Sequence, residues 1–151
     1  MLKAEKDFEE FVELLNKFNA EYMIVGAYAL ALYTHPRNTG DIDIFINSSS
    51  ENAKLIIKVI KEFGFEDAGI QESDFTTKGR IVQLGVSPIR IDIMNDIDGI
   101  DFMDAYKRKE TFQFGKVMAD FISRLDIIAN KKASKRKKDQ ADLDELEKYG
   151  N

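Results

Sequence analysis

Apolar residues recur along the chain with two different periods, and the period changes from segment to segment. From about Glu5 to Phe18 the spacing is helical, which predicts an amphipathic helix that covers a core. The uninterrupted apolar run Tyr22–Val25 predicts a buried strand. Strict alternation over Asp41–Ile46 and again over Ile89–Met94 predicts two strands, each with one apolar face. The stretch from Tyr22 to Met94 is therefore organised around three strands.

Local signals place the remaining elements. A helix is expected to start at Gly26, directly after the first strand, and another to follow the capping-box pattern Ser48–Glu51 and to stop at Gly64. Further along, we expect a strand from Arg80 to Leu84, short helices over 71–75 and 101–109, and a hairpin made by Thr111–Phe114 and Val117–Phe121. Near the C-terminus, a helix should begin at the capping box at Ser123 and carry apolar Leu125, Ile128 and Ala129. A last helix is expected over Asp139–Tyr149, with Leu143 and Leu146 packed against the core.

Length and composition fit a single domain over residues 1–151, with a C-terminal helical segment at about 123–149. The chain has no cysteine, which excludes a disulfide framework and fits a reducing, cytoplasmic setting. We expect no signal peptide and no membrane association, because the N-terminus lacks an apolar core and no apolar run is long enough to span a bilayer.

The net charge of −5 is unevenly distributed. Six of the eight residues from Lys131 to Lys138 are basic, so the rest of the chain is clearly acidic. An acidic body disfavours broad, non-specific DNA binding but permits a local contact with phosphate.

Two aspartates are expected to lie side by side at the start of the second strand. Because side chains alternate along a strand, Asp41 and Asp43 share one face, while Ile42, Ile44 and Ile46 share the other. The helix that begins at Gly26 offers unpaired N–H groups, which suit phosphate, and paired carboxylates suit Mg²⁺. The pattern is typical of a site for a metal-bound nucleoside triphosphate.

A third aspartate, Asp92, lies on the later strand and shares a face with Arg90 and Met94. Any strand with one wet face alternates apolar with polar residues, so these aspartates need have no special role. Yet Asp is disfavoured in strands, and three neighbouring carboxylates repel one another unless a cation is present. Spacing alone leaves both interpretations open.

The ordered set of motifs resembles the nucleotidyltransferase superfamily of DNA polymerase beta. The residues that carry the resemblance are Gly26 at a helix start, Asp41-Ile42-Asp43-Ile44 on a strand, and Asp92 on a later strand. More narrowly, the run Pro36-Arg37-Asn38-Thr39-Gly40-Asp41-Ile42-Asp43 and the tail Arg136-Lys137-Lys138-Asp139 followed by Ala141-Asp142-Leu143 resemble the small AbiEii-like bacterial and archaeal nucleotidyltransferases.

This resemblance implies an α+β fold in which a mixed sheet has helices packed on one face and the C-terminal helices lie beside the active site. It implies transfer of a nucleoside monophosphate from a nucleoside triphosphate to an acceptor hydroxyl, with two Mg²⁺ (or Mn²⁺) ions held by Asp41, Asp43 and Asp92. Asp92 would also take the acceptor proton, and the N–H groups of Gly26 and Ala27 would hold the outer phosphates. The acceptor could be a tRNA, a protein or a small molecule.

Several nucleotide-binding assignments carry open alternatives. Arg37 suits either a phosphate contact or a link from its loop to the sheet, and Thr39 suits either nucleotide binding or the turn that follows it. Lys131 and Lys138 lie in the basic segment, where phosphate contact and simple solvation are both consistent with the sequence.

Ala27 departs from the family pattern, which usually has Gly or Ser at this position. The backbone N–H is retained, but a hydroxyl is lost. A second interpretation is therefore a non-catalytic module that binds a nucleotide or a partner, since relatives of this group occur in toxin–antitoxin and phage-defence systems. A third is an antibiotic-modifying enzyme of the same fold with a cationic acceptor.

Overall fold

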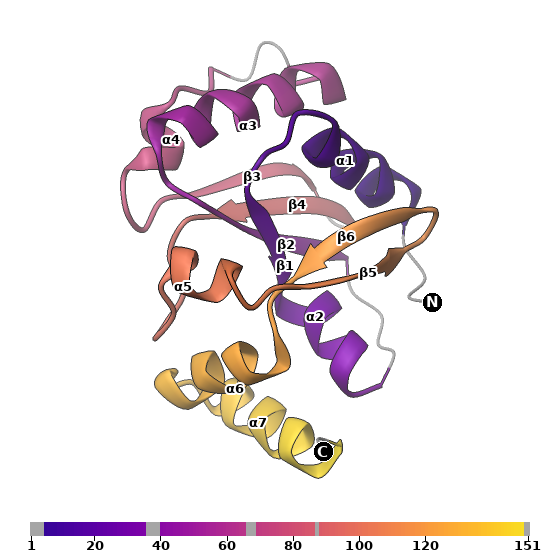
Figure 1. The fold of residues 1–151 in the computed structure, drawn as a ribbon, viewed down its shortest axis with the longest axis vertical. Helices are drawn as coiled ribbons and strands as arrows, with labels where there is room; N and C mark the ends of the chain where they lie inside the picture. Colours follow the sequence, from indigo (N-terminus) through magenta and orange to yellow (C-terminus); the bar gives the residue numbers. More distant parts are fainter. Residues whose placement is uncertain (1–4, 36–39, 66–68, 87, 150–151) are drawn as a thin grey trace.

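The computed structural model describes residues 5–35, 40–65, 69–86 and 88–149, and these form a mixed α+β structure (Figure 1). Within these ranges six strands form one sheet in the order β3-β4-β2-β1-β6-β5. The strands are β1 Tyr22–Val25, β2 Asp41–Ile46, β3 Ile81–Val86, β4 Ile89–Met94, β5 Glu110–Phe114 and β6 Val117–Phe121. The helices are α1 Lys6–Lys17, α2 Gly26–Tyr33, α3 Ser50–Phe63, α4 Ser73–Thr76, α5 Phe102–Tyr106, α6 Arg124–Ala133 and α7 Lys137–Tyr149.

The centre of the sheet is made by β1, β2 and β4. β1 lies antiparallel to β2, which in turn lies parallel to β4. All four residues of β1 are buried, as its uninterrupted apolar sequence requires of a strand covered on both faces. β1, β2 and β4 have the bounds predicted from the sequence, because their pattern of apolar positions leaves little choice of face.

Helices lie on both sides of the strands in Figure 1, with α1, α3 and α4 above them and α2, α6 and α7 below. α1 buries the apolar stripe expected from its spacing and packs against α3, where the rings of Phe11 and Phe63 meet edge to face. The resemblance led us to expect helices packed on one face of the sheet. The structure differs: Phe45, on the face of β2 that carries Asp41 and Asp43, packs against Phe102 of α5 with ring centroids 5.1 Å apart.

The capping of α3 differs by one residue from the predicted pattern. Ser49, not Ser48, is the N-cap, and its side chain accepts a hydrogen bond from the backbone N–H of Asn52. Asn52 is buried and bonds both backbone groups of Glu21, which joins the start of α3 to the start of β1. Gly64 ends the helix in the left-handed conformation, as predicted.

The C-terminal helices pack beside α2 rather than on the sheet (Figure 1). Ser123 caps α6 as predicted, and the side chain of Asp126 there accepts two hydrogen bonds from Arg108. Leu125 is 70% exposed, because the packed side of α6 carries Ile127 instead. Leu146 anchors α7 and is fully buried. In the described part of the chain, no helix combines the length and the apolar character needed to cross a bilayer.

Candidate active site

Three carboxylates meet where β2 and β4 run side by side. The parallel register places Asp43 directly opposite Asp92, and Asp41 opposite Arg90. One carboxylate oxygen from each of Asp41, Asp43 and Asp92 lies within 4.8 Å of the others. Asp92 is buried, whereas Asp41 and Asp43 are half-buried. The structure therefore brings the three aspartates together, and they are placed as a set of hard oxygen ligands would be.

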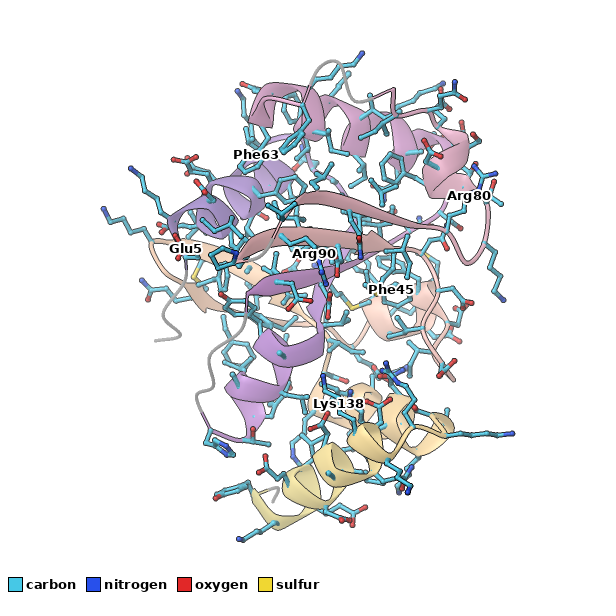
Figure 2. The ribbon with its side chains drawn as sticks, turned by 180° about the vertical axis from the view of Figure 1, so that it is seen from behind. Glu5, Phe45, Phe63, Arg80, Arg90 and Lys138 are labelled. Carbon is cyan, nitrogen blue, oxygen red and sulfur yellow. The ribbon has the colours of Figure 1, made fainter. Side chains whose placement is uncertain are left out.

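Arg90 is the cation that lies against this cluster (Figure 2). Its Nε donates to Oδ1 of Asp92 at 2.9 Å, and its terminal nitrogen Nη2 donates to Oδ2 of Asp92 and to Oδ2 of Asp41, each at 3.0 Å. The hydrogen bonds to Asp92 raise the pKa of Arg90, so the guanidinium keeps its charge. Arg90 thus balances part of the negative charge of two of the three aspartates.

Gly26 brings the start of α2 against the third aspartate. Its φ is +67°, and a Cβ at this position would lie 2.1 Å from Oδ2 of Asp43. Only glycine combines this backbone conformation with such a close approach. The residue before it, Val25, offers no side-chain cap to α2. The first N–H groups of α2, at Gly26 and Ala27, consequently receive no hydrogen bond from an N-cap side chain in the described part of the chain.

Asp43 is the aspartate of the cluster whose pKa is raised. Burial, together with the charges of Asp41 and Asp92, raises the pKa of its carboxyl from the ordinary 3.8 to about 7, against the lowering effect of Arg90 and Lys138. Within the described part of the chain, Arg90 donates hydrogen bonds to Asp41 and Asp92 but none to Asp43. A further cation near Asp43 would therefore relieve a real cost of bringing these groups together.

The basic segment divides into two environments. Lys131 is buried, and its Nζ lies 2.9 Å from Oδ1 of Asp139 and 3.5 Å from Oδ2 of Asp142. Asp139 also accepts hydrogen bonds from Ser134 and Arg136. Although burial opposes ionisation, these bonds hold the pKa of Asp139 down at about 2. Lys131 is thus part of an ion-pair network that joins α6 to α7.

Lys138 is exposed at the start of α7, on the side of the C-terminal helices nearest the strands (Figure 2). Its charge lowers the pKa of Asp43, which places its influence at the carboxylate cluster. Arg37 and Thr39, the other two residues assigned to nucleotide binding, lie outside the described residues.

Two features of the site were not predicted. No role was predicted for Arg90. Its spacing of two residues from Asp92 on one strand nevertheless puts both side chains on the same face. The network around Lys131 had no comparable signal, because it depends on how the chain turns between α6 and α7.

A comparison with known protein families shows which family the chain belongs to. The model of a family described as "Nucleotidyl transferase of unknown function (DUF2204)" matches residues 4–151. This chain belongs to that family. The family name indicates a transferase with a nucleotide substrate, in agreement with the superfamily suggested by the three aspartates. No curated protein matches the chain.

Proposed function

We propose that this protein is a metal-dependent enzyme that transfers a nucleoside monophosphate from a nucleoside triphosphate to an acceptor hydroxyl. The acceptor oxygen forms a bond to the α-phosphorus, the bond from that phosphorus to the β-phosphate oxygen breaks, and pyrophosphate leaves. The observation that carries the proposal is the meeting of Asp41, Asp43 and Asp92 within 4.8 Å beside the uncapped start of α2.

The residues present fit a divalent cation. The donor set consists of three carboxylates, the ligand type that Mg²⁺ and Mn²⁺ prefer, and the missing Cβ of Gly26 lets the start of α2 lie directly against the carboxylate of Asp43. Asp41, Asp43 and Asp92 would hold Mg²⁺ or Mn²⁺, which when bound neutralises charge on the triphosphate and lowers the pKa of the acceptor hydroxyl.

The start of α2 is suited to the outer phosphates. The N–H groups of Gly26 and Ala27 lie at the positive end of the helix and have no side-chain cap. Lys138 adds an exposed positive charge at the start of α7, and its lowering effect on the pKa of Asp43 supports a role for it in the same region. We assign these three residues to binding and orienting the triphosphate, whereas the ammonium of Lys131 is already held by Asp139.

Asp92 is the residue that we assign to accept the proton of the acceptor hydroxyl. It is the most buried of the three aspartates, and Arg90 fixes the orientation of its carboxylate through two hydrogen bonds. A fixed orientation favours proton transfer, because a general base must lie within hydrogen-bond reach of the proton that it removes.

Two extensions of this proposal rest on the resemblance to AbiEii-like enzymes. The acceptor hydroxyl would belong to a tRNA, a protein or a small molecule, and the protein would be part of a toxin–antitoxin or phage-defence pair. The alternative is binding of a nucleotide without turnover. Ala27 favours that alternative, since the hydroxyl that related sequences place here is missing.

The test is incubation of the protein with each α-³²P-labelled triphosphate, Mg²⁺ and whole-cell lysate or RNA, followed by separation of labelled products. We expect label to appear in one class of acceptor, and to be lost in Asp43→Asn. Asp74→Asn is the matched control, because Asp74 is a carboxylate that pairs with Arg80 outside the cluster. Saturable triphosphate binding with no labelled acceptor and no pyrophosphate release would instead support the binding module.

A further inference from the structure

Arg90 donates hydrogen bonds to half of the six carboxylate oxygens of the cluster. Its guanidinium engages both oxygens of Asp92 and one oxygen of Asp41. These are two of the three residues that the proposed function assigns to a divalent cation. Asp43, which is not part of this pairing, carries the raised pKa.

The arrangement differs from an ordinary structural ion pair. Arg108 makes the same two-pronged contact with Asp126, but Asp126 lies in the first turn of α6, bonded to the N-cap Ser123, and among the described residues it belongs to no group of carboxylates that could hold a metal. Arg90 instead lies among like charges that would repel one another without it. Its side chain is 32% exposed, so it has room to move away from the strands.

A guanidinium and a divalent cation compete for the same oxygens. Each neutralises the carboxylates, and the two cations repel each other at contact distances. Mg²⁺ also demands near-ideal geometry around it, which a carboxylate already aligned on a guanidinium does not offer freely.

We propose that Arg90 is a built-in counter-ion, which stabilises the carboxylate cluster in the metal-free protein and must leave at least one of Asp41 and Asp92 when the metal binds. This inference rests on the proposed metal site. It assigns Arg90 as a positioning residue that sets the affinity for metal, and it predicts that the wild-type affinity is held below what the three aspartates alone would give.

The experiment is titration of Mn²⁺ into the nucleotide-free protein, followed by calorimetry and by the electron paramagnetic resonance signal of free Mn²⁺. Arg90→Gln removes the competing charge and should tighten Mn²⁺ binding by about tenfold or more, the equivalent of about 1.4 kcal/mol. Arg90→Lys keeps a charge but loses the two-pronged geometry, so its affinity should fall between those of Arg90→Gln and the wild type. Arg80→Gln, which removes a surface ion pair with Asp74, is the matched control and should leave Mn²⁺ binding unchanged.

Thermal melts give a second readout. Without metal, Arg90→Gln should melt at a lower temperature than the wild type, because the three carboxylates lose their counter-ion. Saturating Mn²⁺ should close that gap. A merely structural arginine would not behave in this way, since its loss would weaken metal binding along with the fold.

The outcomes separate this inference from the proposed function. If the wild type binds Mn²⁺ and Arg90→Gln binds it equally or more weakly, the counter-ion role is overturned while the metal site stands. If Arg90→Gln binds Mn²⁺ and the wild type does not, the role is supported in its strongest form. If neither binds, both proposals fail. Should Arg90→Gln not fold, Arg90→Lys decides, and an affinity at or below that of the wild type overturns the role.

Discussion

Gly26 lies so close to Asp43 that a Cβ on Gly26 would come within 2.1 Å of the carboxylate oxygen Oδ2. The start of α2, which we assign to the triphosphate, and the carboxylate that we assign to the metal are therefore in direct van der Waals contact. A change at either residue is transmitted to the other without any intermediate group, because close-packed atoms cannot absorb it.

Gly26→Ala should damage the site as well as the fold. A left-handed conformation costs alanine roughly 1–2 kcal/mol, and the added methyl must also push Asp43 away. We expect the loss of stability to exceed that cost, and Mn²⁺ binding and transfer to fall. Denaturant unfolding and Mn²⁺ titration measure the two effects.

Gly69→Ala is the matched control for this substitution. Gly69 has the same φ of +67°, but no atom of the described residues lies within 4 Å of the position of its Cβ. It should show the backbone cost alone and leave Mn²⁺ binding intact. Equal effects of the two substitutions on Mn²⁺ binding would show that contact with Asp43 has no role.

Asp43 should make the metal-free protein less stable as the pH rises. Its pKa is raised in the folded state from 3.8 to about 7, so the folded state holds a proton that the unfolded state has lost. This contribution to stability is fully present below about pH 3.8 and is lost as the pH rises through about 7. The difference in unfolding free energy between the wild type and Asp43→Asn, measured from pH 4 to pH 8, should follow this decline. A difference that is constant over that range would contradict the assignment.

Metal binding should show the opposite trend with pH. A carboxylate must lose its proton before it can bind a cation, so Mn²⁺ affinity should rise with pH up to about 7 and then level off. Calorimetric titration at a series of pH values gives the profile. An affinity that does not change between pH 5.5 and pH 7.5 would show that Asp43 is not among the ligands.

Asp92→Asn should separate chemistry from stability. The substitution removes one of the repelling charges but also weakens the two hydrogen bonds from Arg90, so we expect a small net change in melting temperature. Transfer should fall by ~10²–10⁴-fold, as is typical when a general base is lost.

The control for Asp92→Asn is Asp120→Asn, since Asp120 is also a strand aspartate with a cationic partner, Lys109, but lies outside the cluster. It should retain transfer. A lowered melting temperature with unchanged transfer in Asp92→Asn would assign Asp92 to structure.

Lys131→Met and Lys138→Met should have different consequences, although the two residues lie in the same basic segment. Loss of Lys131 leaves Asp139 and Asp142 without their buried partner, which typically costs ~3–5 kcal/mol. Loss of the exposed Lys138 should leave the unfolding free energy within about 0.5 kcal/mol and raise the triphosphate dissociation constant. Denaturant unfolding and calorimetry measure these effects, and a stable Lys131→Met variant with weakened triphosphate binding would reverse the two assignments.

Much of the site was predictable because it lies on strands. Alternation alone placed Asp41 and Asp43 on one face of their strand and Asp92 on the polar face of the later strand. The structure adds the register that brings the two strands, and so the three carboxylates, together. The same alternation puts Arg90 and Asp92 on one face, so their pairing could also have been predicted from the sequence.

The C-terminal helices were harder to predict, because short helices leave their orientation to tertiary packing. Leu125 is apolar yet exposed, while Lys131 is charged yet buried, so hydrophobicity points to the wrong side of α6 at both positions. What decides the orientation is the cluster of bonds to Asp139, whose donors lie on α6 and in the connection between α6 and α7.

The parallel register of β2 and β4 makes the site independent of the length of chain between them. Asp43 and Asp92 are brought together by strand pairing alone, so α3, α4 and β3 can be regarded as a single insert between two fixed positions. Residues can be added or removed at its surface turns without moving a carboxylate, whereas one residue inserted within either strand would turn the aspartates of that strand towards the opposite face. Proteins built on this arrangement can thus differ in length between β2 and β4 and still hold the three carboxylates together.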